Sequence, residues 1–190
     1  MAEPKQGPIL LRSKQGIADV VRPGLTLRVE QDLGIGSFRI VGPDAAQAFE
    51  RLTGHKPPEA GRLETRDEVT YAWLAPAEWL LSGEGSRVDR VIVRINEHGG
   101  GSVLAVDLSH GRTAMLLCGE DVRNAIAAHC PLDLSEHAFP ISAVARSLLG
   151  DAGMFVARLP DAYDGARFRV IVDQTMGPYA ARLLAPGHIC

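Results

Sequence analysis

The sequence predicts an α+β fold with mostly antiparallel sheets, built by tandem duplication of one unit. Three observations predict it. Short segments with the two-residue apolar period of β-strands are interrupted by single helical segments, which favours α+β over a parallel α/β sheet. A stretch that starts at Gly24 recurs from Gly101 without a gap. Both halves also show the same order of elements: strand, strand, helix, two or three strands, helix.

The first unit opens with two predicted strands. Residues 25–29 alternate apolar and polar side chains, which is typical of a strand with one buried face. Gly34 and Gly36 predict a turn, and the second strand covers residues 38–41. A dinucleotide-binding loop at the two glycines is excluded, because its third glycine would have to stand where this chain has Arg39.

Two helices are predicted in the first unit. Pro43 suits the first position of one helix, and Gly54 suits its end. A hairpin with strands 69–74 and 78–81 follows, and Ser86 is the predicted cap of the second helix. The apolar faces of the two helices are Ala45, Ala48, Phe49 and Leu52, and Val88, Val91, Ile92 and Ile95.

Three glycines, Gly99 to Gly101, separate the two units. A shift of 77 residues relates the first strands and helix of both units. A later shift of 88 places the second apolar face on Met176, Tyr179, Ala180 and Leu183. The sequence therefore predicts a flexible tail over residues 1–16 and two units over residues 17–98 and 99–190, which together form one compact body.

Composition excludes several classes of protein. The chain has 190 residues, of which 46% are apolar and 23% charged, as in an ordinary globular protein. No apolar run approaches the roughly 20 residues of a membrane span. A net charge of −3 and a pI of about 6.1 argue against a nucleic-acid partner. Three cysteines without C-x-x-C spacing do not form a disulfide framework, so we expect a cytoplasmic location.

No motif of catalysis, cofactor binding or metal binding stands out in the sequence. Walker A and nucleophile-elbow sequences are absent, and the six histidines include no His-x-x-x-His pair. Ser109 and His110 are adjacent in an extended segment, so they point in opposite directions and cannot form a nucleophile–base pair. Asp107, Ser109 and Gly111 instead predict a turn. We therefore expect no catalytic, cofactor-binding or metal-binding residues in this chain.

Two groups of residues are candidates for docking a partner. Trp73 and Trp79 bracket the first hairpin, where they belong either to the core or to an interface. Arg87, Arg90 and Arg94 form a stripe opposite the apolar face of the second helix. That stripe is either a solvated surface or a docking ridge, because arginine is enriched at interfaces.

Two segments carry a resemblance to a known family. The first is the hairpin from Trp73 to Leu81, with Ala-Pro-Ala at its turn. The second runs from Val106 to Arg146 and contains Asp-Leu-Ser-His-Gly-Arg, Leu-Cys-Gly, Pro-Leu-Asp-Leu and Ala-Phe-Pro in that order. This order and spacing resemble the gamma subunit of heterotetrameric sarcosine oxidase, over nearly the whole chain after the N-terminal tail.

That family is in turn similar to the folate-binding aminomethyltransferase, the T-protein of the glycine cleavage system. Residues 107–110 match its Asp-Val-Ser-His stretch, and residues 119–121 match its Gly-Pro-Asp turn. The T-protein handles folate with an aspartate from a later Gly-Gly-Ile-x-Asp-Asp hairpin. In this chain Met154 and Phe155 stand near the place of the Asp-Asp pair, and Asp151 precedes it. The resemblance therefore implies that the carboxylate needed for the acid–base step is missing.

The resemblance implies a non-catalytic gamma subunit that supports oxidative demethylation of sarcosine to glycine, with transfer of the one-carbon unit to tetrahydrofolate. FAD, FMN, NAD and tetrahydrofolate would be bound by the partner chains, and none by this one. The expected partners are the alpha, beta and delta subunits, with alpha contacted most directly. The alternative function is a stand-alone folate-binding or aminomethyltransferase-like protein. A homo-oligomer of the isolated chain also stays open, because a surface built for docking leaves apolar area uncovered.

Overall fold

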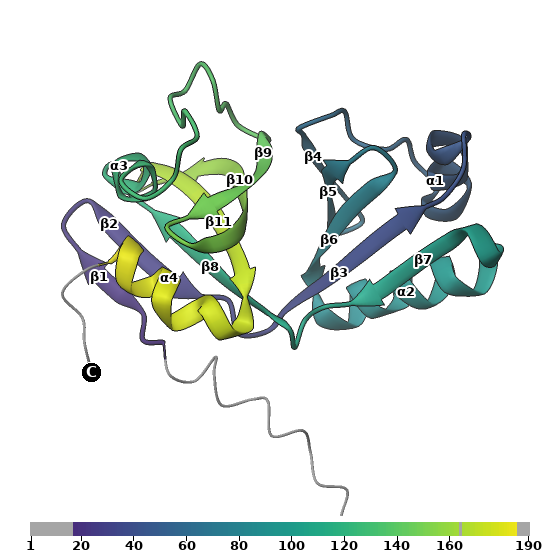
Figure 1. The fold of residues 1–190 in the computed structure, drawn as a ribbon, viewed down its shortest axis with the longest axis horizontal. Helices are drawn as coiled ribbons and strands as arrows, with labels where there is room; N and C mark the ends of the chain where they lie inside the picture. The colour runs from purple at the N-terminus through teal and green to yellow at the C-terminus, as the bar shows by residue number, and fades with distance from the viewer. Residues whose placement is uncertain (1–16, 164, 186–190) are drawn as a thin grey trace, which may run out of the picture.

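The computed structural model describes residues 17–163 and 165–185. Two antiparallel sheets face each other, and helices cover the outer face of each, so the layers run helix, sheet, sheet, helix (Figure 1). The predicted α+β class with antiparallel sheets is confirmed. The tail predicted over residues 1–16 lies outside the described residues.

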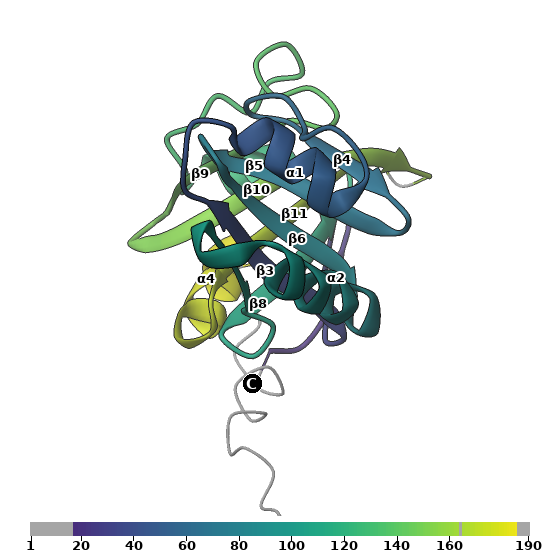
Figure 2. The ribbon, with the colours of Figure 1, turned by 90° about the vertical axis from the view of Figure 1, so that its right-hand side faces the viewer.

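The first sheet has the strand order β4-β5-β6-β3-β7. Its strands are β3 (Leu33–Ile40), β4 (Leu63–Arg66), β5 (Val69–Ala75), β6 (Glu78–Glu84) and β7 (Val103–Asp107). Helices α1 (Ala45–Thr53) and α2 (Gly85–His98) cover its outer face, as Figure 2 shows. The short 3-10 helix η3 (Gly100–Ser102) leads from α2 into β7.

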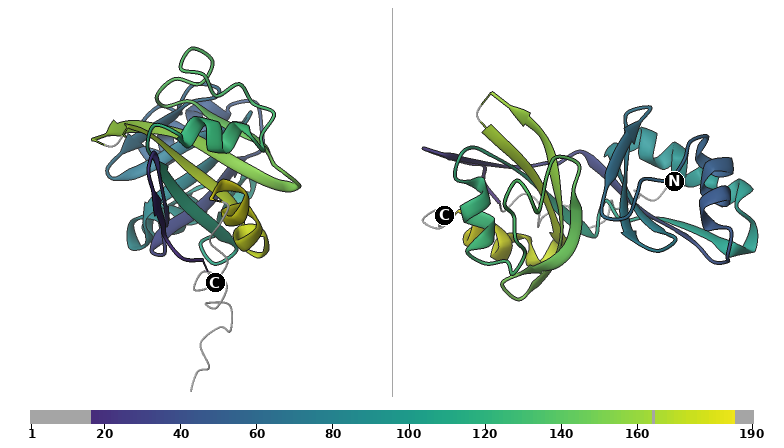
Figure 3. Two further views of the ribbon diagram at one scale, coloured as in Figure 1. Left: turned by 90° about the vertical axis from the view of Figure 1, so that its left-hand side faces the viewer. Right: turned by 90° about the horizontal axis from the view of Figure 1, so that it is seen from above.

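The second sheet has the strand order β1-β2-β8-β11-β10-β9. Its strands are β1 (Val20–Arg22), β2 (Leu25–Val29), β8 (Arg112–Cys118), β9 (Val144–Leu149), β10 (Ala152–Ala162) and β11 (Gly165–Asp173). Helix α3 (Val122–Ala127), the 3-10 helix η4 (Gln174–Met176) and helix α4 (Gly177–Leu184) lie on its outer side (Figure 3).

Each sheet contains strands from the other half of the chain: β7 in the first sheet, and the β1–β2 hairpin in the second. Strand β7, from the second half, pairs with β3, and Val106 lies opposite Ser37. Strand β2, from the first half, pairs with β8, and Leu27 lies opposite Leu117. The two sheets therefore do not coincide with the two sequence units, and neither unit completes a sheet alone.

The glycines of the predicted turn lie inside a strand, so that prediction is wrong. Gly34 and Gly36 belong to β3 and pair with β6. A Cβ atom on Gly34 would lie 2.8 Å from Cα of Gly85, and one on Gly36 would lie 2.9 Å from Cδ1 of Ile92. The missing side chains thus let α2 approach the sheet, and the physical constraint is helix packing rather than chain reversal.

Helix α2 begins at Gly85, before Ser86, the residue predicted to cap it. The Glu84 carboxylate accepts hydrogen bonds from the backbone N–H groups of Ser86 and Arg87, at 3.0 and 3.1 Å, so Glu84 and not Ser86 is the cap. A hydrogen bond from the Ser86 hydroxyl, and after it these backbone bonds, hold the pKa of Glu84 below its usual value. The Asp173 carboxylate accepts the Thr175 N–H at 3.0 Å in the same way before η4 and α4.

These equivalent caps correct the second shift of the repeat. Glu84 and Asp173 are 89 residues apart, since 173 − 84 = 89. With this shift the buried Ile95 of α2 falls on Leu184 of α4, which is also buried. The shift of 88 would place Ile95 on the partly buried Leu183 instead. The shift is set by the lengths of the hairpins before each helix, which the apolar pattern alone did not resolve.

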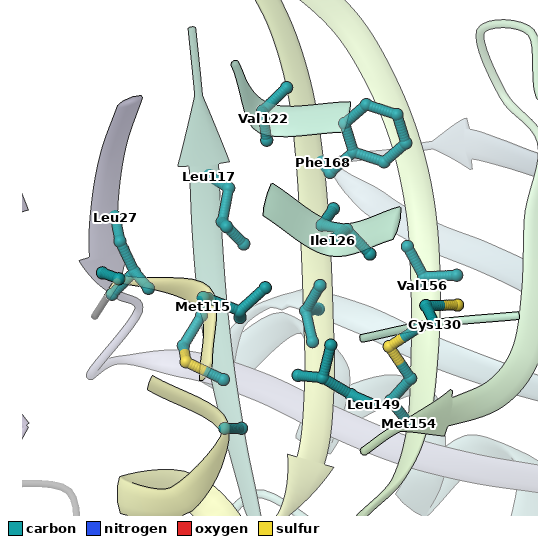
Figure 4. Close-up of a cluster of buried hydrophobic side chains, with 14 of the residues drawn as sticks. Leu27, Met115, Leu117, Val122, Ile126, Cys130, Leu149, Met154, Val156 and Phe168 are labelled. Atoms are coloured by element: carbon teal, nitrogen blue, oxygen red, sulfur yellow. The ribbon is translucent and has the colours of Figure 1, made fainter. Parts of the chain in front are cut away.

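The core has three parts. One lies between the first sheet and its helices, around Phe38 and Phe49. A second lies between the second sheet and α3 and α4, where Leu27 of β2 packs beside Leu117 and Ile126, as Figure 4 shows. The third joins the inner faces of the two sheets and contains Ile35, Leu63, Ala72, Leu80, Ala114, Val144, Phe155, Ala157, Leu159 and Ile171.

The side chain of Asn96 bonds the backbone at the unpaired edge of β7. Asn96 on α2 donates from Nδ2 to the Ala105 carbonyl at 2.9 Å, and its Oδ1 accepts the Ala105 N–H at 3.0 Å. Both edge-facing backbone groups of Ala105 are therefore satisfied within the chain. This protects β7 from pairing with a further strand at its centre.

A largely buried ion pair of the second sheet also contacts the first sheet. Arg169 on β11 donates to both carboxylate oxygens of Glu30 at 2.6 and 2.7 Å, and its Nη1 lies 3.4 Å from Ser82 Oγ on β6. Glu30 follows β2, directly before the chain crosses to the first sheet. The bidentate geometry fixes this crossing relative to both sheets.

We expect Glu30→Ala to lower the free energy of unfolding by about 2–3 kcal/mol, because Arg169 would keep its buried position without a counter-charge. Urea denaturation measures the change. The control is Glu64→Ala, which breaks the exposed Arg66–Glu64 pair (3.0 Å) and should cost no more than about 1 kcal/mol. Equal losses in the two variants would show that the buried Glu30–Arg169 pair stabilises the fold no more than an exposed pair does.

Candidate partner-docking site

The two tryptophans of the docking prediction lie at the core of the first sheet. Trp79 on β6 is only 3% exposed, and its ring centroid is 4.6 Å from that of Phe49 and 5.4 Å from that of Phe38. Trp73 lies opposite Trp79 on β5 and is partly buried against the same cluster. The sequence assigns Trp79 either to the core or to an interface, and the structure supports the core.

The three arginines of the docking prediction share one face of α2. Arg87, Arg90 and Arg94 line a surface hollow of about 340 Å³, which we call the arginine hollow. It lies between α2 and the turn joining β4 and β5, where Arg66 adds a fourth guanidinium group. The other lining residues are Asp67, Val69, Tyr71 and Val91.

Carboxylates neutralise only part of this charge. Glu68 pairs with Arg87 at 2.5 Å, and Glu64 pairs with Arg66 at 3.0 Å. Arg90 donates to Ser86 Oγ at 3.3 Å, and Arg94 donates to the Thr53 carbonyl at 3.5 Å. Among residues 17–163 and 165–185, neither Arg90 nor Arg94 forms an ion pair.

Tyr71 lies against the arginine hollow. Its side chain is buried, and this burial raises the pKa of the hydroxyl above its usual value. The positive charge of Arg94 acts in the opposite direction, and the nearby Asp67 carboxylate adds to the rise. The hydroxyl is thus held in its neutral form, in which it can donate a hydrogen bond.

A second surface, between the two sheets, was missed by the sequence analysis. We call it the inter-sheet groove, and it has a volume of about 690 Å³. Its apolar side chains come from both inner faces, with Leu74, Leu80, Val106 and Leu108 on one side and Phe155 and Ile171 on the other. Charged groups of Glu78, Arg112, Arg146 and Asp173 also line it. Only the relative placement of the sheets brings these residues together.

Further apolar side chains are exposed on the edge strands of the two sheets. Leu104 and Val106 lie on the inner-facing positions of edge strand β7, and Leu148 on those of edge strand β9. Leu104 is 59% exposed and Leu148 is 52% exposed. Exposed aliphatic side chains beside an apolar groove are typical of an interaction surface. The two-residue period of residues 103–107 could have indicated which side chains share the inner face of the sheet. It could not have indicated that Leu104 and Val106 remain exposed on that face.

A third hollow, of about 460 Å³, lies at the base of the sheets where β3, α2 and the β7–β8 turn meet. Asp107 accepts the Ser109 N–H at 2.8 Å, which confirms the predicted turn. Ser109 Oγ in turn accepts the Ile35 N–H at 2.9 Å. Glu84, also in this hollow, caps α2. These carboxylates thus hold backbone groups of the fold.

Asp151, the residue nearest to the missing Asp-Asp pair, lies outside all three hollows. It occupies the exposed turn between β9 and β10, where its N–H donates to the Tyr179 hydroxyl at 3.2 Å. Across the described part of the chain, no group of three or more His, Cys, Asp or Glu side chains could hold a metal ion. No helix within residues 17–163 and 165–185 is long and apolar enough to cross a membrane.

The family model described as "Sarcosine oxidase, gamma subunit family" matches residues 39–176 of the 190 residues. This chain belongs to that family. The resemblance stated from the two sequence segments is thereby confirmed. The matched region includes the arginine hollow and, except for Ser37, the lining of the inter-sheet groove.

Solved structures support the fold of this family member. A chain of the heterotetrameric sarcosine oxidase from Corynebacterium sp. U-96, solved in complex with pyrrole 2-carboxylate, is similar with a TM-score of 0.72 and 18% identity, over 94% of this chain and 93% of that chain. The glycine cleavage system aminomethyltransferase T from Bartonella henselae is similar with a TM-score of 0.65 and 12% identity, over 93% of this chain and 48% of that chain. This chain therefore spans about half the length of that aminomethyltransferase. No curated protein sequence matches.

We expect Gly153→Leu to change the free energy of unfolding by less than about 0.5 kcal/mol, because the new side chain enters open groove space. A Cβ atom on Gly153, which lines the inter-sheet groove, meets nothing within 4 Å. The matched variant is Gly83→Ala on β6, whose Cβ would lie 2.7 Å from the Glu68 carbonyl oxygen. That variant should lose about 1–3 kcal/mol in the same thermal or urea denaturation. A large loss in Gly153→Leu would contradict an open groove.

Proposed function

We propose that this chain is a non-catalytic gamma subunit of a heterotetrameric sarcosine oxidase. The single observation that carries the proposal is the family match over residues 39–176. The similar chain from Corynebacterium comes from a heterotetramer, so the partners we propose for this chain are alpha, beta and delta subunits, with alpha contacted most directly. The complex would act in the cytoplasm.

The role proposed within the complex is structural. The reaction supported is the oxidative demethylation of sarcosine to glycine, with transfer of the one-carbon unit to tetrahydrofolate. A carboxylate poised over the reacting nitrogen is what the acid–base step requires. The nearest candidate in the sequence, Asp151, lies in an exposed turn instead. This supports placing catalysis, and the binding of FAD, FMN, NAD and tetrahydrofolate, on the partner chains.

The surfaces of the chain support a docking role. The inter-sheet groove has an apolar lining, and Leu104 and Leu148 are exposed on the two edge strands β7 and β9. The arginine hollow adds a basic area on the outer side of the first sheet. Apolar contact area together with arginines has the composition of a protein–protein interface. The docking residues proposed on this basis are Arg87, Arg90 and Arg94, with Trp73 at the edge of the core.

We expect this chain to co-elute with alpha, beta and delta subunits when all four are co-expressed and run on a sizing column. A complex prepared without this chain should keep its bound flavins, because they are held by the other subunits. Calorimetric titration of the isolated chain with tetrahydrofolate should give no heat of binding. Absence of co-elution would remove the proposal, and micromolar folate binding by the isolated chain would favour a stand-alone folate-binding protein.

A further inference from the structure

The internal duplication allows the arginine hollow to be compared with its counterpart in the same molecule. With the 89-residue shift, Arg87, Arg90 and Arg94 of α2 correspond to Met176, Tyr179 and Leu183 at and within α4. Met176 and Leu183 pack against the core of the second sheet. The Tyr179 hydroxyl accepts the Asp151 N–H of the neighbouring turn at 3.2 Å. In the second unit these three positions thus serve packing within the chain.

The first unit uses the same three positions differently. Their side chains are guanidinium groups that line an open hollow of about 340 Å³. They stand at i, i+3 and i+7, so they share one face of the helix. The second unit has apolar or aromatic side chains at these three positions, whereas the first unit forms the same helix and sheet with arginines there. The arginines are therefore not a requirement of the shared architecture.

The local charge balance favours an anionic partner. Glu68 neutralises Arg87, and Glu64 neutralises Arg66. Arg90 and Arg94 are exposed and form no ion pair within the described residues. The carboxylate among the lining residues is that of Asp67, which acts on the buried Tyr71. The Glu84 carboxylate interacts with Arg90 without forming an ion pair. Both guanidinium groups thus lack a carboxylate at ion-pair distance, and each can bind one with two parallel hydrogen bonds.

The surroundings of these arginines favour a polypeptide over a free ion. Val91 lines the hollow, and Val93 on the same helix is 53% exposed. Val93 lies one turn after Arg90, so apolar and cationic groups alternate along the helix surface. A nucleic acid is disfavoured because the whole chain has a net charge of −3.

We propose that the arginine hollow of α2 binds an acidic polypeptide segment of a partner subunit, whose carboxylates pair with Arg90 and Arg94. The proposal rests on the proposed function, because it assumes an assembly of subunits. Glu64 and Glu68 hold Arg66 and Arg87 beside the hollow, which keeps its sides ordered. The apolar part of the segment would cover Val91 and Val93.

The test is the double variant Arg90→Glu/Arg94→Glu, assembled with the alpha, beta and delta subunits. We expect affinity for the partner subunits to fall by about tenfold or more at low salt, because each charge pair becomes a repulsion. The difference should shrink as salt is raised, since exposed charges are screened. The control is Arg182→Glu, which changes an exposed arginine on α4 and should leave assembly unchanged. Arg90→Lys/Arg94→Lys should retain most of the affinity, and thermal denaturation shows whether each variant is folded.

A second arm uses the isolated chain and a fluorescent decapeptide of glutamate, followed by anisotropy at low salt. Wild-type chain should bind the peptide, and the double glutamate variant should not. If the wild-type complex forms and the double variant assembles equally well, the acidic segment is wrong while the proposed function stands. If no complex forms with the wild-type chain, the proposed function fails. The peptide experiment then decides by itself whether the arginine hollow binds acidic segments. Failure to bind the peptide, or tighter binding of single-stranded DNA at the same salt, would overturn the proposal.

Discussion

The structure depends on an exchange of strands between its two halves. The β1–β2 hairpin belongs to the second sheet and β7 to the first, so the chain crosses between the sheets twice. Both crossings are held by specific contacts. Glu30 pairs with Arg169 after β2, and Ser109 binds the Ile35 N–H after β7. Because each sheet contains strands from both halves, the two sheets are tied together by backbone pairing as well as by side-chain packing.

This exchange also explains where the free surfaces lie. The inner faces of the sheets meet around Ile35 and Phe155, where an apolar cluster joins them. Away from that contact the inner faces separate, and the inter-sheet groove opens between them. The exposed side chains of Leu104 and Leu148 belong to the two edge strands beside it. The groove is thus a consequence of how two sheets with a fixed crossing pack, and it leaves apolar area for a partner to cover.

Duplication produced one backbone plan with two different outer surfaces. Glu84 caps α2, Asp173 caps the η4 turn that leads into α4, and the equivalent positions Ile95 and Leu184 are both buried. The positions that carry the arginines differ: arginines line a hollow on α2, while of the corresponding residues Met176 and Leu183 pack against the core and Tyr179 bonds the turn between β9 and β10. Such divergence is expected where the buried face is constrained by packing and the outer face is free to acquire a binding role.

The sequence by itself determined the fold class, the duplicated order of elements and the family, because apolar periodicity and short motifs are local properties. It also identified the turn at Asp107 and the arginine stripe of α2. Tertiary structure decided what local pattern cannot express. Glycine stands at positions 34 and 36 of strand β3 because α2 packs closely there. Trp79 is buried because it packs against Phe38 and Phe49. The groove is formed by residues of two different sheets. The physical reason is that burial and open space depend on contacts between segments distant in the chain, which no single stretch of sequence contains.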